Sequence, residues 1–517
     1  MKKPPLKNNA DPMRQPPLTT PYLLGSLFLS GASCLVFELA GARLISPFYG
    51  SSIYTWSAMI TVTMVALAAG YAWGGRLADR QPYLLLFARL LTAAGLTAAA
   101  VPWLRVPVLR ASLPLGVQFG ALASAAALMG PALMLLGALG PVAVRLTATG
   151  AFDSGRRSGD AWAVSTAGSV LGAVLTGFVL VPLLPLSKII YGTALLLLLL
   201  GALGSWLSQR AVPVAQLAAC AACLALALMP AAKSRIAFSS SESAYGKIVV
   251  LDTPDKRYLL VNGTSQSVMD KPGGESESQY VRGLEWTRAL RPNAKRALVI
   301  GLGAGLLPKA LERRGLTVDA FEIDPAIAES AYKEFGYEPK GRVLIGDGRA
   351  LLEAGLGPWD LAFLDAFGAE SPPSHLFTAE AFARVRDSLS PNGVFAINIV
   401  SAVAPPDDLP WKAIYKTLAE TFPNVRAFVA SDPNEGLGNI LLFASTGPLE
   451  GGTVKSPAHA SREVSYMLTR ELRPAARDLE AAPVMTDDFA PLDALMAGTA
   501  RRWRRLLQQS MPEVLLD

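Results

Sequence analysis

Long apolar runs dominate the first half of the chain. Seven of them follow one another, at 22–44, 53–75, 83–104, 115–146, 161–183, 189–207 and 212–229. Because a helix needs about 20 apolar residues to span a bilayer, this pattern predicts a multi-pass helical membrane domain. The fourth run is the longest and contains Pro131 and Pro141, so it predicts one kinked helix or two short ones. We therefore expect seven or eight helices.

Alternating polar and apolar positions replace these runs after residue 233. The segments 245–251 and 257–261, joined by a Thr-Pro-Asp-Lys turn, predict a β-hairpin. Further strands, with helices between them, are expected near Ala297, Val318, Arg342, Leu361, Val394, Val425 and Asn439. That alternation predicts a doubly wound α/β sheet. The expected parts are a disordered basic tail at 1–20, a transmembrane domain at 21–232, a small β-rich subdomain at 233–292 and the α/β domain at 293–517.

A glycine-rich stretch opens the α/β domain. Gly301, Gly303 and Gly305 directly follow the apolar run 297–300. Glycines after a strand let the backbone pass close under a ligand, although the same residues also build plain tight turns. The glycines alone therefore leave a ligand site and a simple turn open.

Three acidic residues that end successive apolar runs favour the ligand site. They are Glu322, Asp347 and Asp365. The carboxyl ends of parallel strands meet at one edge of a sheet, and a carboxylate about 20 residues after the glycines can accept both ribose hydroxyls. The pattern predicts a nucleoside site at that edge.

Composition agrees with a membrane protein. Of the 517 residues, 51% are hydrophobic, and the mean hydropathy is +0.34, which is too apolar for an ordinary soluble protein. The net charge of +6 is spread over loops and helix ends, so we expect a lipid bilayer and not nucleic acid as a partner. The three cysteines and two histidines form no cluster, so neither a disulfide framework nor a metal site is expected.

Charge leaves the orientation of the membrane domain open. Basic residues favour a cytoplasmic N-terminus; they lie in the N-terminal tail and at Arg76, Arg80, Arg145, Arg156 and Arg157. Seven helices would then put the C-terminal domain outside, whereas a domain that uses a cytosolic nucleoside should lie inside. Either the fourth run counts as two helices or the charge bias misleads.

The apolar runs also contain small-residue spacings and ionisable groups. The spacings, which let helices approach closely, are Gly70-x-x-x-Gly74 and Gly168-x-x-x-Gly172. Glu38, Arg43 and Arg89 lie at membrane depth, where charge is costly. A structural ion pair between helices and a polar pocket for a cationic or amphipathic ligand are both open.

Several motifs together resemble the polyamine aminopropyltransferases (the spermidine synthase family), in particular their membrane-fused members. The motifs of the membrane part are Phe37-Glu38-Leu39-Ala40-Gly41-Ala42-Arg43-Leu44, Tyr54-Thr55-Trp56 and Ser165-Thr166-Ala167-Gly168-Ser169. Those of the C-terminal part are Asp365-Ala366-Phe367, Ser374-His375-Leu376 and Thr486-Asp487-Asp488-Phe489-Ala490-Pro491. The resemblance implies a multi-pass protein of the cell (inner) membrane with a cytoplasmic, Rossmann-like catalytic domain of methyltransferase type.

The reaction that the resemblance implies is attack of a small amine on decarboxylated S-adenosylmethionine. The amine attacks the carbon next to the sulfonium, and 5′-methylthioadenosine is released; the donor is a co-substrate, and no tightly bound cofactor is implied. By the same resemblance, Gly301, Gly303 and Gly305 lie under the nucleoside, Glu322 holds the ribose, and Asp347 with Gly348 contacts the adenine. Self-association of the chain is left open.

Asp365 matches the family's proton acceptor. The physical interpretation agrees, because a carboxylate at the tip of a strand can orient an attacking amine and take its proton. A helix cap or a loop anchor is the alternative role for this residue. The loop 366–377 that follows is rich in Gly, Pro and Ser, which predicts a lid over the sulfonium, with His375 as its anchor or as a solvated loop residue.

Departures from the family pattern fall on the amine side. The family's aspartate within the glycine motif is Ala304 here, and its second aspartate after the catalytic one is Gly368. Its Tyr-His-Glu stretch is Tyr280-Val281-Arg282, and its Asp-Gly pair is Asn262-Gly263, before Gln266. These changes remove negative charge, and a dicationic acceptor such as putrescine needs paired carboxylates. Specificity for putrescine is therefore not expected.

Three functions follow from these departures. Glu370, Asp487 and Asp488 can supply replacement acids and keep aminopropyl transfer to some amine. Alternatively, Arg282 pairs with the carboxylate of S-adenosylmethionine, which predicts a lyase, an aminocarboxypropyltransferase or a methyltransferase. A transporter or sensor that binds a nucleoside without catalysis is the third hypothesis.

Overall fold

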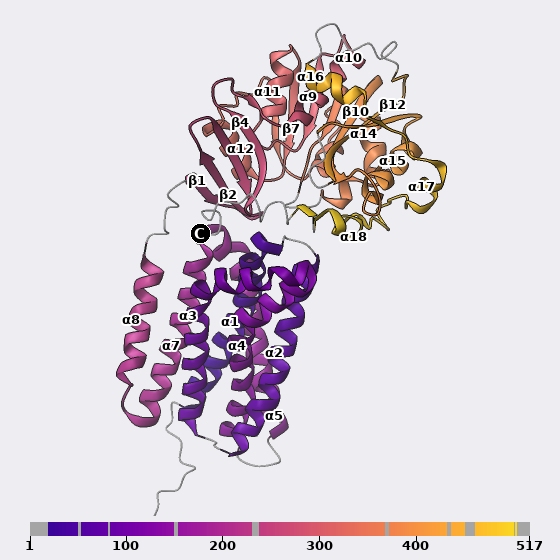
Figure 1. The fold of residues 1–517 in the computed structure, drawn as a ribbon. Helices are drawn as coiled ribbons and strands as arrows, with labels where there is room; N and C mark the ends of the chain where they lie inside the picture. Colours follow the sequence, from indigo (N-terminus) through magenta and orange to yellow (C-terminus); the bar gives the residue numbers. More distant parts are fainter. Residues whose placement is uncertain are drawn as a thin grey trace, which may run out of the picture. The chain divides into compact units, whose positions relative to one another are not determined.

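The structure is a computed structural model of the chain (Figure 1). It describes residues 19–49, 53–80, 83–148, 154–229, 237–367, 372–431, 436–449, 461–500 and 502–503. The chain forms two compact units, a helical one before residue 232 and an α/β one after it, and each is described by itself.

Helices form all the regular structure described in the first unit. Their bounds are α1 (Thr19–Tyr49), α2 (Ile53–Arg80), α3 (Leu84–Ser112), the 3-10 turn Leu113–Leu115, α4 (Gly116–Thr147), α5 (Ser154–Leu175), which continues as the π-helical turn Thr176–Leu180 and α6 (Val181–Leu183), α7 (Leu186–Gln209) and α8 (Val214–Leu228). Six of these segments are long and apolar enough to cross a membrane, by length and composition. The prediction of a multi-pass helical domain therefore has six candidate spans in the described residues.

Each of the seven predicted runs forms a helix in the described residues, and α8 differs from the other six in length. The fourth run is one continuous helix, α4, which contains both Pro131 and Pro141. The seventh run forms α8, which has 15 residues and is therefore about 22 Å long at 1.5 Å per residue. The hydrocarbon core of a bilayer is about 30 Å thick, so α8 is shorter than a straight span.

Close helix packing at the small-residue spacings is confirmed. A Cβ atom at Gly168 would overlap the carbonyl oxygen of Phe28, and one at Gly172 would lie 2.5 Å from the carbonyl oxygen of Ala32. The hydroxyl of Ser169 donates to the carbonyl oxygen of Gly31 at 3.1 Å. Helices α1 and α5 therefore touch backbone to backbone. The other spacing does the same between α2 and α4, where a Cβ at Gly74 would lie 2.6 Å from the Cα of Ala138.

The ionisable groups of the apolar runs are not alike in exposure. Glu38 and Arg43 on α1 are half-buried, whereas Arg89 is exposed near the start of α3. An arginine at a helix end can extend its guanidinium toward the headgroups. Of the three, Glu38 lies farthest from a helix end, so its charge is the most costly to place within a bilayer.

The second unit contains two sheets. The smaller is antiparallel, in the order β1-β2-β3-β4-β5, with the bounds β1 (Ala237–Glu242), β2 (Lys247–Asp252), β3 (Lys256–Val261), β4 (Thr264–Asp270) and β5 (Glu275–Ser276). Its β2–β3 pair, in which Leu251 lies opposite Tyr258, is the predicted hairpin. Along β4 the register shifts, so that Ser265 and Ser267 have partners on β3 while Gln266 between them is the extra residue of a bulge.

The larger sheet has eight strands in the order β13-β11-β12-β10-β9-β6-β7-β8. The strands are β6 (Arg296–Ile300), β7 (Thr317–Glu322), β8 (Val343–Ile345), β9 (Trp359–Leu364), β10 (Leu389–Ala402), β11 (Asn424–Val429), β12 (Leu437–Ser445) and β13 (Glu471–Leu472). Strands β6 to β10 are parallel, β12 pairs antiparallel with β10, and β11 pairs antiparallel with β12. The predicted doubly wound α/β sheet is confirmed, with an antiparallel edge.

Helices cover both faces of this sheet (Figure 1). They are α9 (Gln279–Glu285), α10 (Thr287–Leu290), α11 (Leu306–Arg313), α12 (Pro325–Lys333), α13 (Gly348–Leu352), the 3-10 turn Ser374–Leu376, α14 (Ala379–Asp387), α15 (Leu409–Thr421), α16 (Arg462–Leu468), α17 (Ala476–Ala481) and α18 (Leu492–Leu495). Alternate residues of β6 serve opposite faces, because side chains alternate along a strand. Leu298 and Ile300 pack toward α14 and α15, while Ala297 and Val299 pack toward α9 and α11.

Substitution at Gly168 tests the contact between α1 and α5. We expect Gly168→Ala to destabilise the helical unit by about 1–3 kcal/mol, the usual cost of overpacking, because the added methyl overlaps the carbonyl of Phe28. Gly25→Ala on α1 is the matched control, since no described atom lies within 4 Å of its Cβ position and alanine favours a helix. The measurement is thermal unfolding in detergent. Equal melting temperatures for the two variants would contradict the packing.

Candidate active site

The candidate site lies at the carboxyl edge of the parallel strands. Gly301 follows β6, and Asp365 follows β9, its neighbour in the sheet; the amide of Asp365 donates to the carbonyl of Ile300 at 2.9 Å. Gly301 has a φ of +97°, and a Cβ atom there would overlap the carbonyl oxygen of Asp365. Only glycine accommodates both the dihedral angle and the close approach. The first glycine of the motif thus places the backbone of Asp365 beside the glycine loop.

Glu322 ends β7 and holds the glycine loop from the other side. Its side chain is buried, with Oε2 accepting from the amide of Leu302 at 2.9 Å and Oε1 from that of Asp324 at 3.0 Å. Burial raises the pKa of Glu322, against the effect of these amides, which lower it. Asp324 is fully buried and caps α12 through the amide of Ala326.

Asp347 follows β8 and caps α13. Its Oδ1 accepts from the amides of Arg349 and Ala350 at 3.0 and 3.1 Å, and Oδ2 lies 2.8 Å from Nε2 of His375. Burial alone would raise the pKa of Asp347, but these amides and His375 outweigh it and lower the pKa. Gly348 packs against β6, where a Cβ would lie 2.6 Å from Cγ2 of Ile300.

Asp365 is held by two side chains. The Tyr280 hydroxyl donates to Oδ2 at 3.1 Å, and Nδ2 of Asn398 donates to Oδ1 at 2.8 Å. Burial raises the pKa of Asp365 to about 6, although both hydrogen bonds lower it. A carboxylate with this pKa is ionised at neutral pH and still basic enough to accept a proton. Tyr280, which the sequence predicted on the substrate side, contacts Asp365 in the structure.

Asn398 was missed by the sequence analysis. It lies on β10 with 1% of its surface exposed, and its Oδ1 accepts from Nδ2 of Asn439 on β12 at 3.0 Å. The amide of Asn439 in turn donates to Oγ of Ser431 at 3.0 Å. Because Asn439 occupies the carbonyl of Asn398, the amino group of Asn398 faces Asp365. The one signal in the sequence was an asparagine in a buried apolar strand, where a polar side chain needs a partner.

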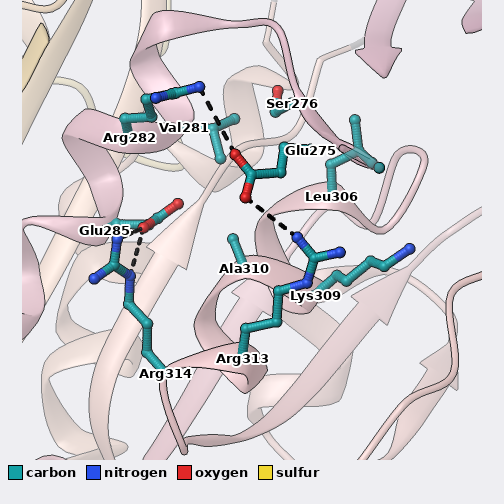
Figure 2. A pocket seen from close by; sticks show the side chains of 11 residues that line it. Glu275, Ser276, Val281, Arg282, Glu285, Leu306, Lys309, Ala310, Arg313 and Arg314 are labelled. Atoms are coloured by element: carbon teal, nitrogen blue, oxygen red, sulfur yellow. Dashed lines mark hydrogen bonds and ion pairs between the residues drawn. The ribbon is translucent and has the colours of Figure 1, made fainter. Parts of the chain in front are cut away.

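The other candidates on the amine side lie apart from Asp365. Residues two apart on a helix face in different directions. Arg282 pairs with Glu275 at 3.8 Å (Figure 2) and with Glu463 at 3.9 Å, while Tyr280 contacts Asp365. Ala304 is buried in an apolar cluster with Ile248, Val250, Leu259, Leu306 and Phe335. Its amide donates to Oγ of Ser267 at 3.2 Å, next to the bulge residue Gln266.

The C-terminal motif fastens the loop that follows β9. Asp487 forms a bidentate ion pair with Arg349 and accepts from the hydroxyl of Thr378 at 2.8 Å. Arg349 also donates to the carbonyl of His375 at 3.2 Å. Asp487 is therefore engaged by Arg349 and Thr378, while Asp488 is exposed.

Two further predictions concern the same region. Glu370, with residues 368–371 of the predicted lid, lies outside the described residues. In the described part of the chain, no group of three or more His, Cys, Asp or Glu side chains is placed to hold a metal ion.

Comparison with known proteins finds relatives of about half of the chain. No family model matches the chain. It is 28% identical over 297 residues to a probable polyamine aminopropyl transferase of Bifidobacterium longum, a match that covers 52% of this chain and 66% of that protein. It is 29% identical over 274 residues to the polyamine aminopropyltransferase of Vibrio vulnificus, covering 49% of this chain and 89% of that protein.

A longer match reaches into the helical unit. The chain is 26% identical over 507 residues to the polyamine aminopropyltransferase of Mycobacterium tuberculosis, which covers 91% of this chain and 92% of that protein. Among solved structures, a probable spermidine synthase from Corynebacterium glutamicum matches with a TM-score of 0.38 and 20% identity over 53% of this chain and 96% of its own. The C-terminal half is thus homologous to polyamine aminopropyltransferases, and with six apolar helices before it the chain fits a membrane-fused, spermidine synthase-like protein.

Proposed function

We propose that the chain transfers an aminopropyl group from decarboxylated S-adenosylmethionine to an amine and releases 5′-methylthioadenosine. The observation that carries this proposal is the carboxylate of Asp365, which stands at the edge of the sheet with a pKa raised to about 6 and with Tyr280 and Asn398 on its two oxygens. The named activity of the homologous proteins supports the same reaction.

In this reaction Asp365 acts as the proton acceptor. The amine nitrogen attacks the carbon next to the sulfonium, the carbon–sulfur bond breaks, and the sulfur keeps the electron pair as the thioether of methylthioadenosine. The new carbon–nitrogen bond leaves a surplus proton on the amine, which Asp365 accepts. Each oxygen of Asp365 accepts one of these two hydrogen bonds and so retains a lone pair for this proton.

The same accounting supports the nucleoside roles. The two oxygens of Glu322 accept the amides of Leu302 and Asp324, and the amide of Gly303 also interacts with this carboxylate. In this proposal the lone pair that these amides leave accepts a ribose hydroxyl. Oδ1 of Asp347 is filled by two amides, while Oδ2 holds only His375 and can accept from the adenine amino group. Gly301, Gly303 and Gly305 have positive φ angles, and in this proposal their backbone lies under the nucleoside.

The carboxylates that are already paired limit which amine can be the acceptor. Asp487 is bound by Arg349, and Arg282 is bound by Glu275 and Glu463. The first pair removes a counter-charge for a second ammonium, and the second disfavours pairing of Arg282 with the carboxylate of S-adenosylmethionine. We therefore favour the decarboxylated donor and an acceptor with one cationic amine.

Six spans also support a proposal for the sidedness of the chain. An even number of crossings returns the chain to the side on which it began. Arg80 ends α2 and Arg145 lies in the last turn of α4, so both fall on the side of the basic N-terminal tail, as the positive-inside rule requires. This arrangement supports a cytoplasmic catalytic unit at the cell membrane.

Replacement of Asp365 tests the proton acceptor. With decarboxylated S-adenosylmethionine and a panel of mono- and diamines, we expect the wild-type protein to release methylthioadenosine and Asp365→Asn to lose about 10²–10⁴-fold in rate, the usual contribution of a general base. The measurement is mass spectrometry of the products. Asp387→Asn, at an exposed carboxylate on α14, is the control and should retain activity. Wild-type rates from Asp365→Asn, or S-adenosylhomocysteine as the product from S-adenosylmethionine, would contradict the proposal.

The pH profile tests the surroundings of Asp365. Its carboxylate must be ionised to accept a proton, so we expect kcat/KM to fall as the pH drops through about 6. The hydrogen bond from Tyr280 lowers the pKa of Asp365; without it, the acidic limb should move to higher pH in Tyr280→Phe. Activity of this variant should recover at alkaline pH. An unmoved limb would show that Tyr280 has only a packing role.

Reporter fusions test the sidedness. Alkaline phosphatase, which is active only outside the cytoplasm, should be inactive when fused after Leu228 and active when fused in the loop between α3 and α4. Activity after Leu228 would mean an odd number of crossings and would overturn the cytoplasmic placement. A fluorescent protein at the same two positions, bright only in the cytoplasm, supplies the reciprocal control.

A further inference from the structure

A pocket of about 150 Å³ lies between α9, α11 and β5 (Figure 2). Its apolar lining comes from Val281, Leu306 and Ala310. Four cationic side chains and two carboxylates surround this lining, so the pocket carries an excess of two positive charges; they are Arg282, Lys309, Arg313, Arg314, Glu275 and Glu285. Such an excess around a concave surface favours an anion.

Glu275 already occupies the position of an anion. One of its carboxylate oxygens lies 3.4 Å from Arg313, and the other lies 3.8 Å from Arg282. Both distances are long for charge-assisted hydrogen bonds, and 58% of the Glu275 side chain is exposed. A carboxylate held so loosely between two guanidinium groups can swing out into solvent. Arg314, by contrast, is paired with the nearly buried Glu285.

Lys309 is the cation with the weakest partner. Its hydrogen bond to the carbonyl oxygen of Gly336 is 3.4 Å long, and no carboxylate among the described residues forms an ion pair with it. Burial lowers the pKa of Lys309, and the positive charge of Arg313 lowers it further. The ammonium of Lys309 and the guanidinium of Arg313 both lie near Gly274, where a Cβ would lie 3.9 Å from Nζ of Lys309 and 3.7 Å from Nη2 of Arg313. The absence of a side chain at Gly274 leaves this space open.

We propose that the pocket binds a phosphate group between Lys309 and Arg313, and that Glu275 stands in for it in the free protein. The size of the pocket favours a small oxyanion, because sites for drug-sized ligands occupy about 300–1,000 Å³. A planar guanidinium and an ammonium are the two side-chain groups that bind phosphate best. The hydroxyl of Ser276 adds a donor to the same lining.

The pocket touches both elements that shape the candidate active site. Helix α9 carries Tyr280, whose hydroxyl contacts Asp365, and α11 begins directly after Gly305 of the glycine loop. The pocket itself lies on the side of α9 that Arg282 faces, apart from Asp365.

Titration with inorganic phosphate tests the proposal. We expect the full-length protein in detergent to bind phosphate in isothermal titration calorimetry, at an ionic strength held constant with chloride. Lys309→Met should weaken binding at least about tenfold, because hydrogen bonds to charged groups contribute roughly 1.5–3 kcal/mol. Glu275→Gln should tighten binding, because it removes the competing carboxylate. Lys333→Met, at an exposed lysine on α12, is the matched control and should bind like the wild type.

The outcomes separate a built site from general screening. Equal phosphate affinity in the wild type and Lys309→Met, no binding by the wild type, or weaker binding by Glu275→Gln would each overturn the proposal. A second titration with glycerol phosphate identifies the source of the group: binding of both ligands indicates the phosphate of a larger molecule, and binding of inorganic phosphate alone indicates the free ion. Neither titration involves the amine or the donor, so failure here leaves the proposed aminopropyl transfer untouched.

Discussion

The close approach of β6 and β9 at their carboxyl ends is the constraint on which the candidate site depends. A side chain at position 301 would strike the carbonyl of Asp365, and the φ of +97° already excludes most residues. With glycine there, β6 and β9 stay paired up to Ile300 and Leu364. The sheet therefore presents the glycine loop, Glu322 and Asp365 along one edge, where a nucleoside and an amine can meet.

The chemistry at this edge is set by a balance of burial against hydrogen bonding. Burial raises the pKa of Asp365, while Tyr280 and Asn398 lower it, and the outcome of about 6 lies close to neutral pH. A buried side-chain amide that lacks a hydrogen-bond partner destabilises the fold by about 1–3 kcal/mol. The hydrogen bond from Asn439 therefore stabilises Asn398, which in turn donates to Asp365. The network therefore sets both the orientation of the carboxylate and its basicity.

Local patterns in the sequence were enough to predict the fold. Runs of apolar residues, glycines after a strand and acids at strand ends act within a few residues of one another, and all three reappear in the structure. The bulge at Gln266 and the contact of Asn398 with Asn439 depend on strand pairing across the sheet. All seven apolar runs form helices, but α8 has only 15 residues, so six of the described segments are long enough to cross a bilayer.

The role of Asp487 depends on its contacts in the fold, which the sequence alone does not show. From the sequence it was a candidate counter-charge for the amine, yet its partner Arg349 lies 138 residues away in the chain and next to the cap residue Asp347. Through Arg349 and Thr378, Asp487 connects the C-terminal segment to α13 and α14. An acid used in this way stabilises the loop that carries His375, which contacts Asp347. Asp487 is thus bound by Arg349 and Thr378, and Ala304 is buried among apolar residues, so neither position supplies an unpaired carboxylate.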